Sequence, residues 1–564
     1  MKKLKLKGLL SLFAVIIIIM LSLTYIASAA DSSATTETTN SEPTPAVIYG
    51  PTEPTTTAAV EEPTTTEQQP ASEELTTEQP TSEEQTTTEE PTTEQPSVEE
   101  PTTGELPSGE PTGIAVEDIY SGWAYWDILM AQTVYGLGNE GTYSNYRGSF
   151  TWMKFTPVLG SIAAKFGIEI EWAKKDEYAY TRGETINDLY SIICTVLDID
   201  ESAQVPAIDY FVEHGLIKGR DGGEYQLDKT GTTEEMIVFS VRVYEYLVNE
   251  LGLDAKGFFW KVTGEKNTVY LLGSIHISDG TLYPMNSEIE SAFDSSGNLV
   301  EEIDFAGETE EESNYIYEKA FVPEGSTIKD YIAPEVYNAY AEICGMFGIP
   351  QSAYDSLQPW YAQMMLDQIA TGISFTGGNT TDLNEIFASF SNVADFGVDN
   401  HFMNKALFQN KNIIGLESSK FQIDMLSSFS PELQEAMLVG SLLNIYDLLG
   451  YSDEESAPAD EANGSGSGNS DAAIYAMLDM WKSGDEKALG EALGVDTVWK
   501  DPLNIEYTDK MITQRNIGMA DKIMVFLNEG EEDYFVIVGA AHMLGENGII
   551  AILLRAGYTV ERIK

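Results

Sequence analysis

A chain of 564 residues is long enough for more than one domain, and its hydrophobic content of 43% supplies at least one sizeable core. The sequence holds 91 acidic against 31 basic residues, which gives a net charge of −60. Because a surface this acidic repels nucleic acid and anionic lipid, we expect neither as a partner.

Residues 1–30 are typical of an export signal. Four lysines in MKKLKLKG precede a long apolar run, and Ala27-Ser28-Ala29 offers a small-residue cleavage site. We therefore predict a secreted protein held at the bacterial cell surface or cell wall. Because the apolar run is near the length that spans a bilayer, the alternative is an uncleaved segment that anchors the chain in the membrane.

Residues 31–113 consist mainly of Thr, Glu, Pro and Ser in loose repeats such as TTEQPTSEEQTTTEEPTTEQP. A segment of this composition has almost nothing apolar to bury and repels itself. We predict a disordered linker, which holds the following domains away from a membrane or carries them through a cell wall.

Residues 114–252 have the apolar spacing of helices. They contain AIDYFVEHGLIKGRDGGEYQLDKTGTTEE, in which a helix, a Gly-rich turn and loop, and a Thr-Thr-Glu-Glu helix start follow one another. This passage resembles an S-layer homology repeat, and the earlier YTRGE resembles the end of a preceding repeat. We therefore predict a small helical domain of the S-layer homology type.

Modules of that family hold proteins on the cell-wall polymer of bacteria. The resemblance implies polymer binding by Thr181, Arg182 and Glu184, which match the Thr-Arg-x-Glu element of the family. In the second repeat Glu234 takes the place of the arginine. The alternative is a helical spacer domain without a ligand.

The chain has two cysteines, Cys194 and Cys344, which lie far apart in apolar contexts. We expect buried free thiols instead of a disulfide or a nucleophile. His214 falls at the end of a helix in FVEHGLIKG, where the helix dipole favours it, so we assign it no catalytic role.

Residues 253–564 alternate short β-like runs with long amphipathic helices. This alternation predicts an α/β or α+β domain. Within it, residues 451–471 are polar and rich in Gly and Ser, which is typical of a flexible surface insertion between two helices.

Two apolar strands of this domain end in the same pattern. NTVYLLGSIH ends at Gly273-x-x-His276, and YFVIVGAAH ends at Gly539-x-x-His542. Because ligands of α/β sheets usually bind at strand ends, the two histidines can meet if both strand ends face one cleft.

A carboxylate suited to the same site occurs in the run LVEEID. If this run is a strand, alternation puts Glu302 and Asp304 on one face and Glu301 on the other. A charge inside an apolar strand costs free energy unless it is paired or bound to a metal. Two histidines and a glutamate form a sufficient donor set for a hydrolytic metal site with an open position for water.

The series GSIHISD, LVEEID, FGVDNHFMNKA, IIGLESSKFQIDML, QRNIGMADKI and VGAAHMLGENGII covers essentially the whole final domain. It resembles the TraB/PrgY/GumN family, which includes the TIKI metalloproteases, with the elements in family order. The resemblance implies a duplicated α/β fold and a peptidase site that depends on a divalent metal (Mn, Co or Zn). Carried over residue by residue, the catalytic and metal-binding set is His276, Glu302 and His542.

Further site candidates lie in the same elements. They are Asp399, His401, Glu417, Arg515 and Asn516. His401 either enters the site or only orients its neighbours through Asp399. Where the family commonly has Glu-Arg-Asn this chain has Gln-Arg-Asn, so one carboxylate is missing there. If Glu302 only orients a metal ligand or acts as a general base, another carboxylate such as Glu417 has to complete the coordination.

Our preferred hypothesis is a surface-held metal-dependent peptidase that acts on peptides or exposed protein segments. The first alternative is a protein anchored to the cell wall that binds or sequesters a pheromone-like peptide without cutting it. The second alternative is a purely structural wall protein, which applies only if the site residues do not converge.

Overall fold

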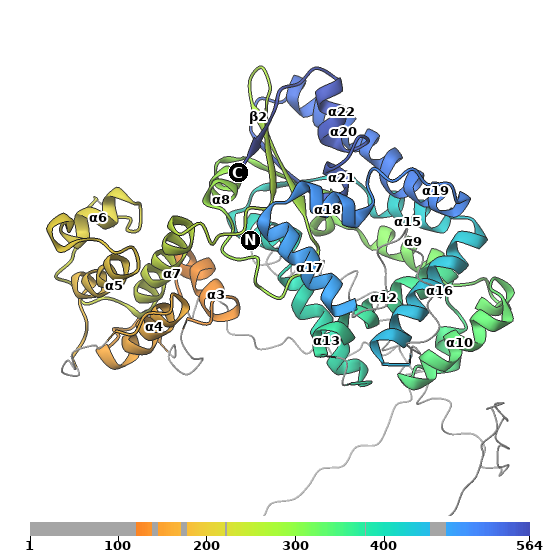
Figure 1. Cartoon of the computed structure of the whole chain (residues 1–564), viewed down its shortest axis with the longest axis horizontal. Helices are drawn as coiled ribbons and strands as arrows, with labels where there is room; N and C mark the ends of the chain where they lie inside the picture. Colours follow the sequence, from red (N-terminus) through yellow and green to blue (C-terminus); the bar gives the residue numbers. More distant parts are fainter. Residues whose placement is uncertain (1–119, 138–144, 171–177, 220–222, 378–379, 452–469) are drawn as a thin grey trace, which may run out of the picture. The chain divides into compact units, whose positions relative to one another are not determined.

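The computed structural model in Figure 1 describes residues 120–137, 145–170, 178–219, 223–377, 380–451 and 470–564. The predicted export signal, the predicted linker and most of the predicted insertion lie outside the described residues. No helix among the described residues is long and apolar enough to cross a membrane. The predicted domain boundaries stay predictions.

The described part of the predicted helical domain consists of short helices around one long helix. These elements are η1 (Gly122–Ala124), α3 (Tyr125–Thr133), α4 (Trp152–Lys165), α5 (Arg182–Val196), η3 (Glu201–Ala203), α6 (Ala207–Glu213) and α7 (Thr233–Glu250). Helix α7 packs against α3, α4 and α5. Aromatic residues such as Phe150, Phe155 and Tyr180 are fully buried between them.

Three helices of this domain begin beside one another. Isolated β-bridges join Ser149 to Thr232, Thr151 to Ala179, and Thr181 to Thr230, so each helix start is tied to the next in a closed ring. Two of the three starts, at Thr181 and Thr232, carry a capping box, whereas the start of α4 at Thr151 has no side-chain cap hydrogen bond.

The residues expected to bind polymer have structural partners at these helix starts. Thr181 and Glu184 form a capping box at the start of α5, and the buried Arg182 forms an ion pair with Glu235 of α7. Glu234 is buried and accepts hydrogen bonds from the backbone N and the Oγ of Ser121, at 2.9 and 3.0 Å. Polymer binding by this domain stays a prediction.

The final domain contains a mixed six-stranded sheet in the order β4-β3-β5-β2-β1-β6. Its strands are β1 (Phe258–Thr263), β2 (Thr268–Ser274), β3 (Asn298–Ile303), β4 (Asn412–Glu417), β5 (Tyr534–Gly539) and β6 (Val560–Ile563). Strands β4, β3, β5 and β2 run parallel, while β1 runs antiparallel to β2 and β6. Strands β2, β3 and β5 are mostly buried, whereas β4 at the edge of the sheet is only partly buried.

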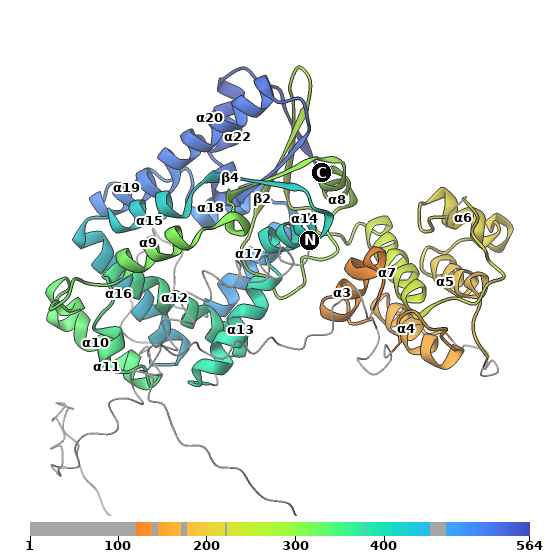
Figure 2. The same cartoon turned by 180° about the vertical axis from the view of Figure 1, so that it is seen from behind.

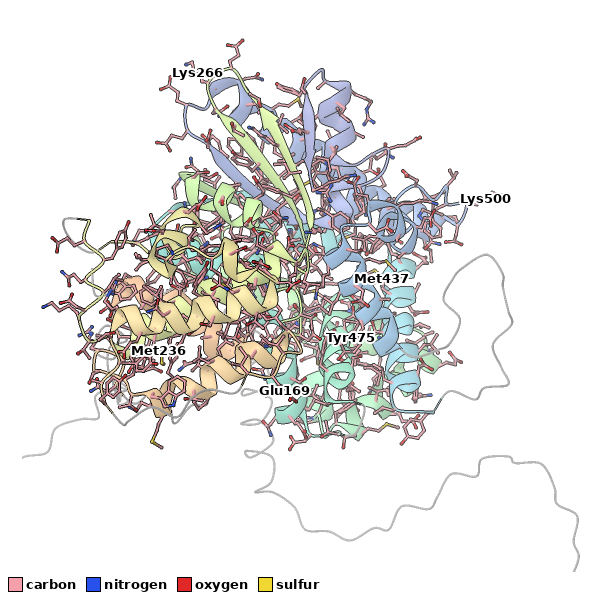
Figure 3. The ribbon with its side chains drawn as sticks, turned by 60° about the vertical axis from the view of Figure 1, so that its left-hand side comes forward. Glu169, Met236, Lys266, Met437, Tyr475 and Lys500 are labelled. Carbon is pink, nitrogen blue, oxygen red and sulfur yellow. The ribbon has the colours of Figure 1, made fainter. Side chains whose placement is uncertain are left out.

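The register brings the carboxyl ends of the parallel strands together. Ser274 of β2 lies opposite Gly539 of β5, and Ile303 of β3 lies opposite Glu417 of β4. The tip of the β1–β2 hairpin, marked by Lys266 in Figure 3, is at the other end of β2.

Helices surround the sheet and build a second core beside it. They are α8 (Ser287–Ser295), η4 (Phe305–Gly307), α9 (Glu310–Ala320), η5 (Ile328–Asp330), α10 (Pro334–Met346), α11 (Gln351–Tyr354), α12 (Pro359–Thr376), α13 (Leu383–Asp395), α14 (Val398–Gln409), α15 (Ser419–Ser427), α16 (Pro431–Leu448), α17 (Ser470–Ser483), α18 (Glu486–Leu493), α19 (Pro502–Thr508), the π-helical turn η6 (Asp509–Thr513), α20 (Gln514–Glu529), α21 (Ala540–Met543) and α22 (Ile549–Arg555). Helix α12 packs between α13 and α16, and α9 lies beside α15 (Figure 2).

The mixed α/β class predicted for this domain is confirmed. The two predicted free, buried cysteines are also confirmed, because Cys194 and Cys344 are both buried and unpaired. The predicted duplication of the domain is not tested by a single sheet of this order and stays a prediction.

Glu245 of α7 makes the stability of the helical domain depend on pH. Burial, and then repulsion from Asp127, raise the pKa of the Glu245 carboxyl to about 8, while Tyr135 donates a hydrogen bond to its Oε1 at 2.7 Å. The carboxyl of a glutamate in an unfolded chain has a pKa of about 4.3. Between these two values the unfolded state releases a proton that the folded state keeps, so stability falls as pH rises.

We therefore expect Glu245→Gln to flatten this pH dependence. Between pH 5 and pH 8 the wild-type chain should lose on the order of 3 kcal/mol more stability than the variant. Thermal unfolding followed by circular dichroism at the two pH values measures the difference. An equal pH response of the two proteins would contradict the assignment.

Candidate active site

The carboxyl ends of the four parallel strands each place one polar side chain at the same edge of the sheet. Glu417 ends β4, Glu302 lies one residue before the end of β3, His276 follows β2, and His542 lies in α21 directly after β5. This edge is where the loops of an α/β sheet converge on a ligand. Both Gly-x-x-His histidines lie just after the ends of their strands, β2 and β5.

The three predicted metal ligands surround Gly539. A methyl group placed on its Cα would lie 3.4 Å from Glu302 Oε1, 3.6 Å from His542 Cδ2 and 3.8 Å from His276 Nε2. The glycine therefore leaves open the point on which these side chains converge. Gly273, the glycine of the first Gly-x-x-His motif, is required for a different reason. A Cβ at this position would lie 3.0 Å from the Cα of Ala540, which is too close for a side chain.

His276 is fixed by an aspartate in the first turn of α14. Its Nδ1 lies 2.8 Å from Asp399 Oδ2, and Ser274 Oγ donates to Asp399 Oδ1 at 2.6 Å. The Asp399 carboxylate raises the pKa of His276 to about 9, although water screens part of this effect because 67% of the side chain is exposed. Because Nδ1 donates to the carboxylate, Nε2 is the ring atom that faces the centre.

His542 is held in the same manner by an amide. Its Nδ1 lies 2.6 Å from Asn516 Oδ1, and Asn516 Nδ2 donates to the carbonyl of Asn547 at 2.8 Å. The amide therefore presents its oxygen to the ring, so Nδ1 carries the proton. Burial lowers the pKa of His542 to about 4, which keeps the ring neutral with Nε2 open, 3.8 Å from Glu302 Oε1.

Glu302 is an ionised carboxylate held by several partners. Its Oε1 accepts the backbone N–H of Gly539 at 2.8 Å, and its Oε2 accepts from Arg515 Nη2 at 2.6 Å. Although burial raises the pKa of Glu302, the nearby His542, His276 and Arg515 lower it to about 2. The carboxyl is therefore charged at any physiological pH.

Arg515 bridges the ends of two strands. Its Nη2 and Nε donate to Glu417 Oε2 at 2.8 and 3.0 Å, while Nη2 also reaches Glu302. Gln422 of α15 donates to Glu417 Oε2 at 2.9 Å. Arg515 itself is only 5% exposed, so the bridge is a buried one. Glu417 thus lies beside the proposed ligands but is engaged by the guanidinium.

The π-helical turn η6 ends at Thr513, two residues before Arg515, and π-helical segments are frequent at functional sites. Gln514, which stands where the family commonly has glutamate, donates instead to Asp509 Oδ2 at 2.7 Å. Gln514 forms no hydrogen bond with Glu302 or Glu417 in the described structure, so this side chain does not take the place of the missing carboxylate.

A cavity of about 390 Å³ lies beside His276, within the size range of small-ligand sites. It is lined by the polar residues His276, Glu301, Glu302, Gln368, Asp399, Asn400 and Gln422 and by the apolar residues Ile277, Ile303, Phe305, Phe390, Ala394 and Met403. The apolar side chains from α13 and α14 give it a largely apolar wall. A ligand in this cavity would therefore contact the site from the side of α14.

His401 does not reach this cavity. The ring is 5% exposed, and its Nε2 lies 2.9 Å from Glu290 Oε1, which belongs to a carboxylate that also pairs with Lys405. His401 is therefore part of a structural cluster between α8 and α14, whereas its neighbour Asp399 contacts His276. Asp304 lies outside the strand in which it was predicted, because β3 ends at Ile303 and Asp304 caps η4.

Sequence reasoning missed two groups that complete the site. Gln422 lies within the motif IIGLESSKFQIDML, but a single glutamine in a helical sequence does not by itself indicate a functional site. The backbone N–H of Gly539 is also invisible as a donor until β5 and β3 are seen to be neighbours.

The donors are of the kind that divalent transition metals prefer, and each imidazole has its second nitrogen fixed by a partner, as is usual for ligating histidines. Among the described residues, however, no group of three or more His, Cys, Asp or Glu side chains is found that could hold a metal ion. The donor types of His276, His542 and Glu302 therefore suit a metal, but their arrangement in this structure does not form a metal-binding group, and Arg515 and Gly539 engage the Glu302 carboxylate.

Comparison with known proteins gives a consistent result. The model of the TraB/PrgY/gumN family matches residues 258–562, which is more than half of the chain. A protein described as "Metalloprotease TIKI homolog" from Nematostella vectensis is 41% identical over 59 residues, which are 10% of this chain and 12% of that relative. The chain therefore spans only a small part of that relative's length. No solved structure matches the chain.

The open point at Gly539 can be filled by one methyl group. Gly539→Ala should fold with a stability within about 1 kcal/mol of the wild type, because its φ of −48° suits alanine and the nearest atoms stay at van der Waals distance. The methyl group should nevertheless weaken binding of Mn, Co or Zn by about tenfold or more, measured by calorimetric titration.

Gly440→Ala is the matched control, because Gly440 lies in α16 with nothing within 4 Å of an added Cβ. Unchanged metal binding by Gly539→Ala would show that no ligand uses this point.

Proposed function

Because the chain belongs to the TraB/PrgY/gumN family, we propose that it is an exported peptidase that depends on a divalent metal and acts on peptides or exposed protein segments. The observation that supports this proposal most is the convergence of His276 Nε2, Glu302 Oε1 and the His542 ring on the open point at Gly539. Two imidazoles and a carboxylate at strand ends are the donor set of a hydrolytic site.

In this proposal His276, His542 and Glu302 hold the metal. The chemistry that a bound Mn, Co or Zn ion supplies is polarisation of a substrate carbonyl and a lowered pKa of bound water. Asp399 and Asn516 each hold the Nδ1 of one ring and so fix the ring orientation in which Nε2 is directed away from them.

Glu302 and Glu417 are the two carboxylates that could serve as metal ligand or general base. If Glu302 serves as a general base instead of a ligand, Glu417 has to move from Arg515 to complete the coordination. Arg515 then pairs with whichever carboxylate stays uncoordinated, so one positive charge remains beside the reacting group in both cases. The cavity beside His276 receives part of the substrate and shields it from water.

A second candidate function is binding of a peptide without cleavage. It is favoured by the engagement of Glu302 with Arg515 and Gly539, and by the lack of a three-donor metal group among the described residues. A protein that sequesters a pheromone-like peptide needs the cavity but not the metal.

Metal analysis and peptide cleavage together distinguish the two functions. We expect the purified chain to retain about one divalent ion and to cleave members of a random peptide library, with cleavage abolished by a chelator and restored by Mn, Co or Zn. His276→Ala should lower the rate by about 100-fold or more. His214→Ala, which removes an exposed histidine from a distant helix end, is the control and should keep full activity.

A chain that holds no divalent metal and cleaves no peptide after addition of Mn, Co or Zn would contradict the peptidase. If that chain still retains peptides, the sequestering function accounts for the site.

We further propose that the helical domain holds the enzyme on the bacterial cell-wall polymer. The support is the S-layer homology pattern and the ring of three helix starts that includes Thr181. The export signal and linker expected from the sequence would bring the chain to the surface and give it reach.

Sedimentation tests this anchoring. The purified chain should pellet with isolated cell-wall polymer and stay in the supernatant when the polymer is omitted or soluble polymer fragments compete. A chain that remains in the supernatant with the polymer present would contradict anchoring and leave the peptidase proposal untouched.

A further inference from the structure

Trp481 of α17 is a fully buried side chain that the proposed chemistry does not use. Its Nε1 donates to the backbone carbonyl of Gly273 at 2.7 Å. Gly273 is the glycine of the first Gly-x-x-His motif, three residues before His276. A buried indole usually finds a partner for its N–H, and here that partner is the backbone of the motif that carries a site residue.

The end of β2 is tightly packed where this hydrogen bond is made. Gly273 lies opposite Val538 of β5, and a Cβ added to it would lie 3.0 Å from the Cα of Ala540. His542 follows Ala540 by two residues in the same short helix, α21. Because packed interiors have little free space, a displacement of Gly273 would change how the two segments that carry the histidines fit together.

Helix α17 (Figure 1) is itself fixed beside the start of the sheet. The backbone N–H of Lys256 donates to the carbonyl of Lys482 at 2.8 Å. The Trp481 ring also packs closely on Gly257, where an added Cβ would lie 3.0 Å from the ring atom Cη2. The indole is therefore held between the residues that lead into β1 and the end of β2.

Helix α14 holds the residues that follow Gly273. The backbone N–H of Val398 donates to the carbonyl of Ile275 at 3.0 Å, and Asp399 binds Nδ1 of His276 at 2.8 Å. The carbonyls held by α17 and by α14 are only two residues apart in the chain. The position of the His276 ring therefore depends on both helices.

We propose that Trp481 is a positioning residue of the site. Its indole N–H fixes the end of β2 through Gly273 and so sets where His276 lies relative to His542. The inference rests on the proposed function only in taking the two histidines to be site residues, because the same placement would serve peptide cleavage and peptide binding alike.

Replacing Trp481 with benzothienylalanine in the full chain tests this role, because a sulfur atom takes the place of the N–H group in a ring of nearly the same shape. The chain has only four histidines, so their ring signals can be followed separately by NMR of protein labelled at histidine. The spectra are recorded in the presence of a chelator. We expect the His276 signal to shift, because the end of β2 loses its hydrogen bond, while the signal of the exposed His214 at the end of α6 stays in place.

Two further variants and a metal titration complete the test. Trp481→Phe also removes the donor and should shift the same signal, whereas Trp123→Phe, which changes a tryptophan that is 53% exposed in η1, should not. The benzothienylalanine variant should also bind Zn about tenfold more weakly than the wild type in a calorimetric titration, as is usual when a group that orients a ligand is lost. A merely structural role of Trp481 would lower the unfolding temperature but leave the His276 signal and the Zn affinity unchanged.

A His276 signal that keeps its wild-type position in both Trp481 variants would overturn the proposal. In the wild-type chain, an indole N–H of Trp481 that exchanges with solvent as fast as that of Trp123 would overturn it without any variant. Because the spectra are recorded without metal, a chain that binds no Zn contradicts the proposed function and leaves the shift of His276 intact. Zn binding that is equally tight in the wild type and the variants contradicts only the positioning role.

Discussion

The site depends on one buried guanidinium between two buried carboxylates. Arg515 reaches Glu302 of β3 and Glu417 of β4 at the same time, and all three side chains are largely withdrawn from water. Without the arginine two negative charges would face each other at the end of a parallel sheet. Removing one partner of such a buried cluster typically costs about 3–5 kcal/mol, so the geometry of the strand ends and the charge of Arg515 are coupled.

The rest of the site follows from how the sheet presents its strand ends. Because β2, β5, β3 and β4 are parallel neighbours, the residues after each strand meet at one edge although hundreds of positions separate them in sequence. The two histidines are then aimed by different partners, a carboxylate for His276 and an amide for His542. Asp399 raises the pKa of the exposed His276, whereas burial lowers the pKa of His542 and keeps its ring neutral, so the two histidines are not equivalent.

The sequence predicted the parts of this arrangement that are encoded locally. A glycine and a histidine after an apolar strand, and a glutamate inside one, indicate positions at strand ends from spacing alone, and the structure places His276, Glu302 and His542 around Gly539. Their roles stay predictions. The mixed α/β class followed from the alternation of apolar runs for the same reason. Peptidase activity, metal binding and polymer binding stay predictions.

The parts that depend on distant partners could not be predicted. Arg515 was a candidate without a defined role, because its partner Glu302 lies 213 positions away. His401 was a candidate by proximity to Asp399, yet Glu290, 111 positions earlier, holds it in a separate cluster. In each case the competing interaction becomes visible only when helices and strands from different parts of the chain are packed together.

The central claim is that His276 and His542 bind one metal ion together. Crystals of the chain grown with Zn and measured at the zinc absorption edge test it most directly. The account predicts one anomalous peak at a bonding distance of about 2.0–2.1 Å from Nε2 of both histidines. Anomalous density that is absent from this position, with zinc present in the crystal, would contradict it.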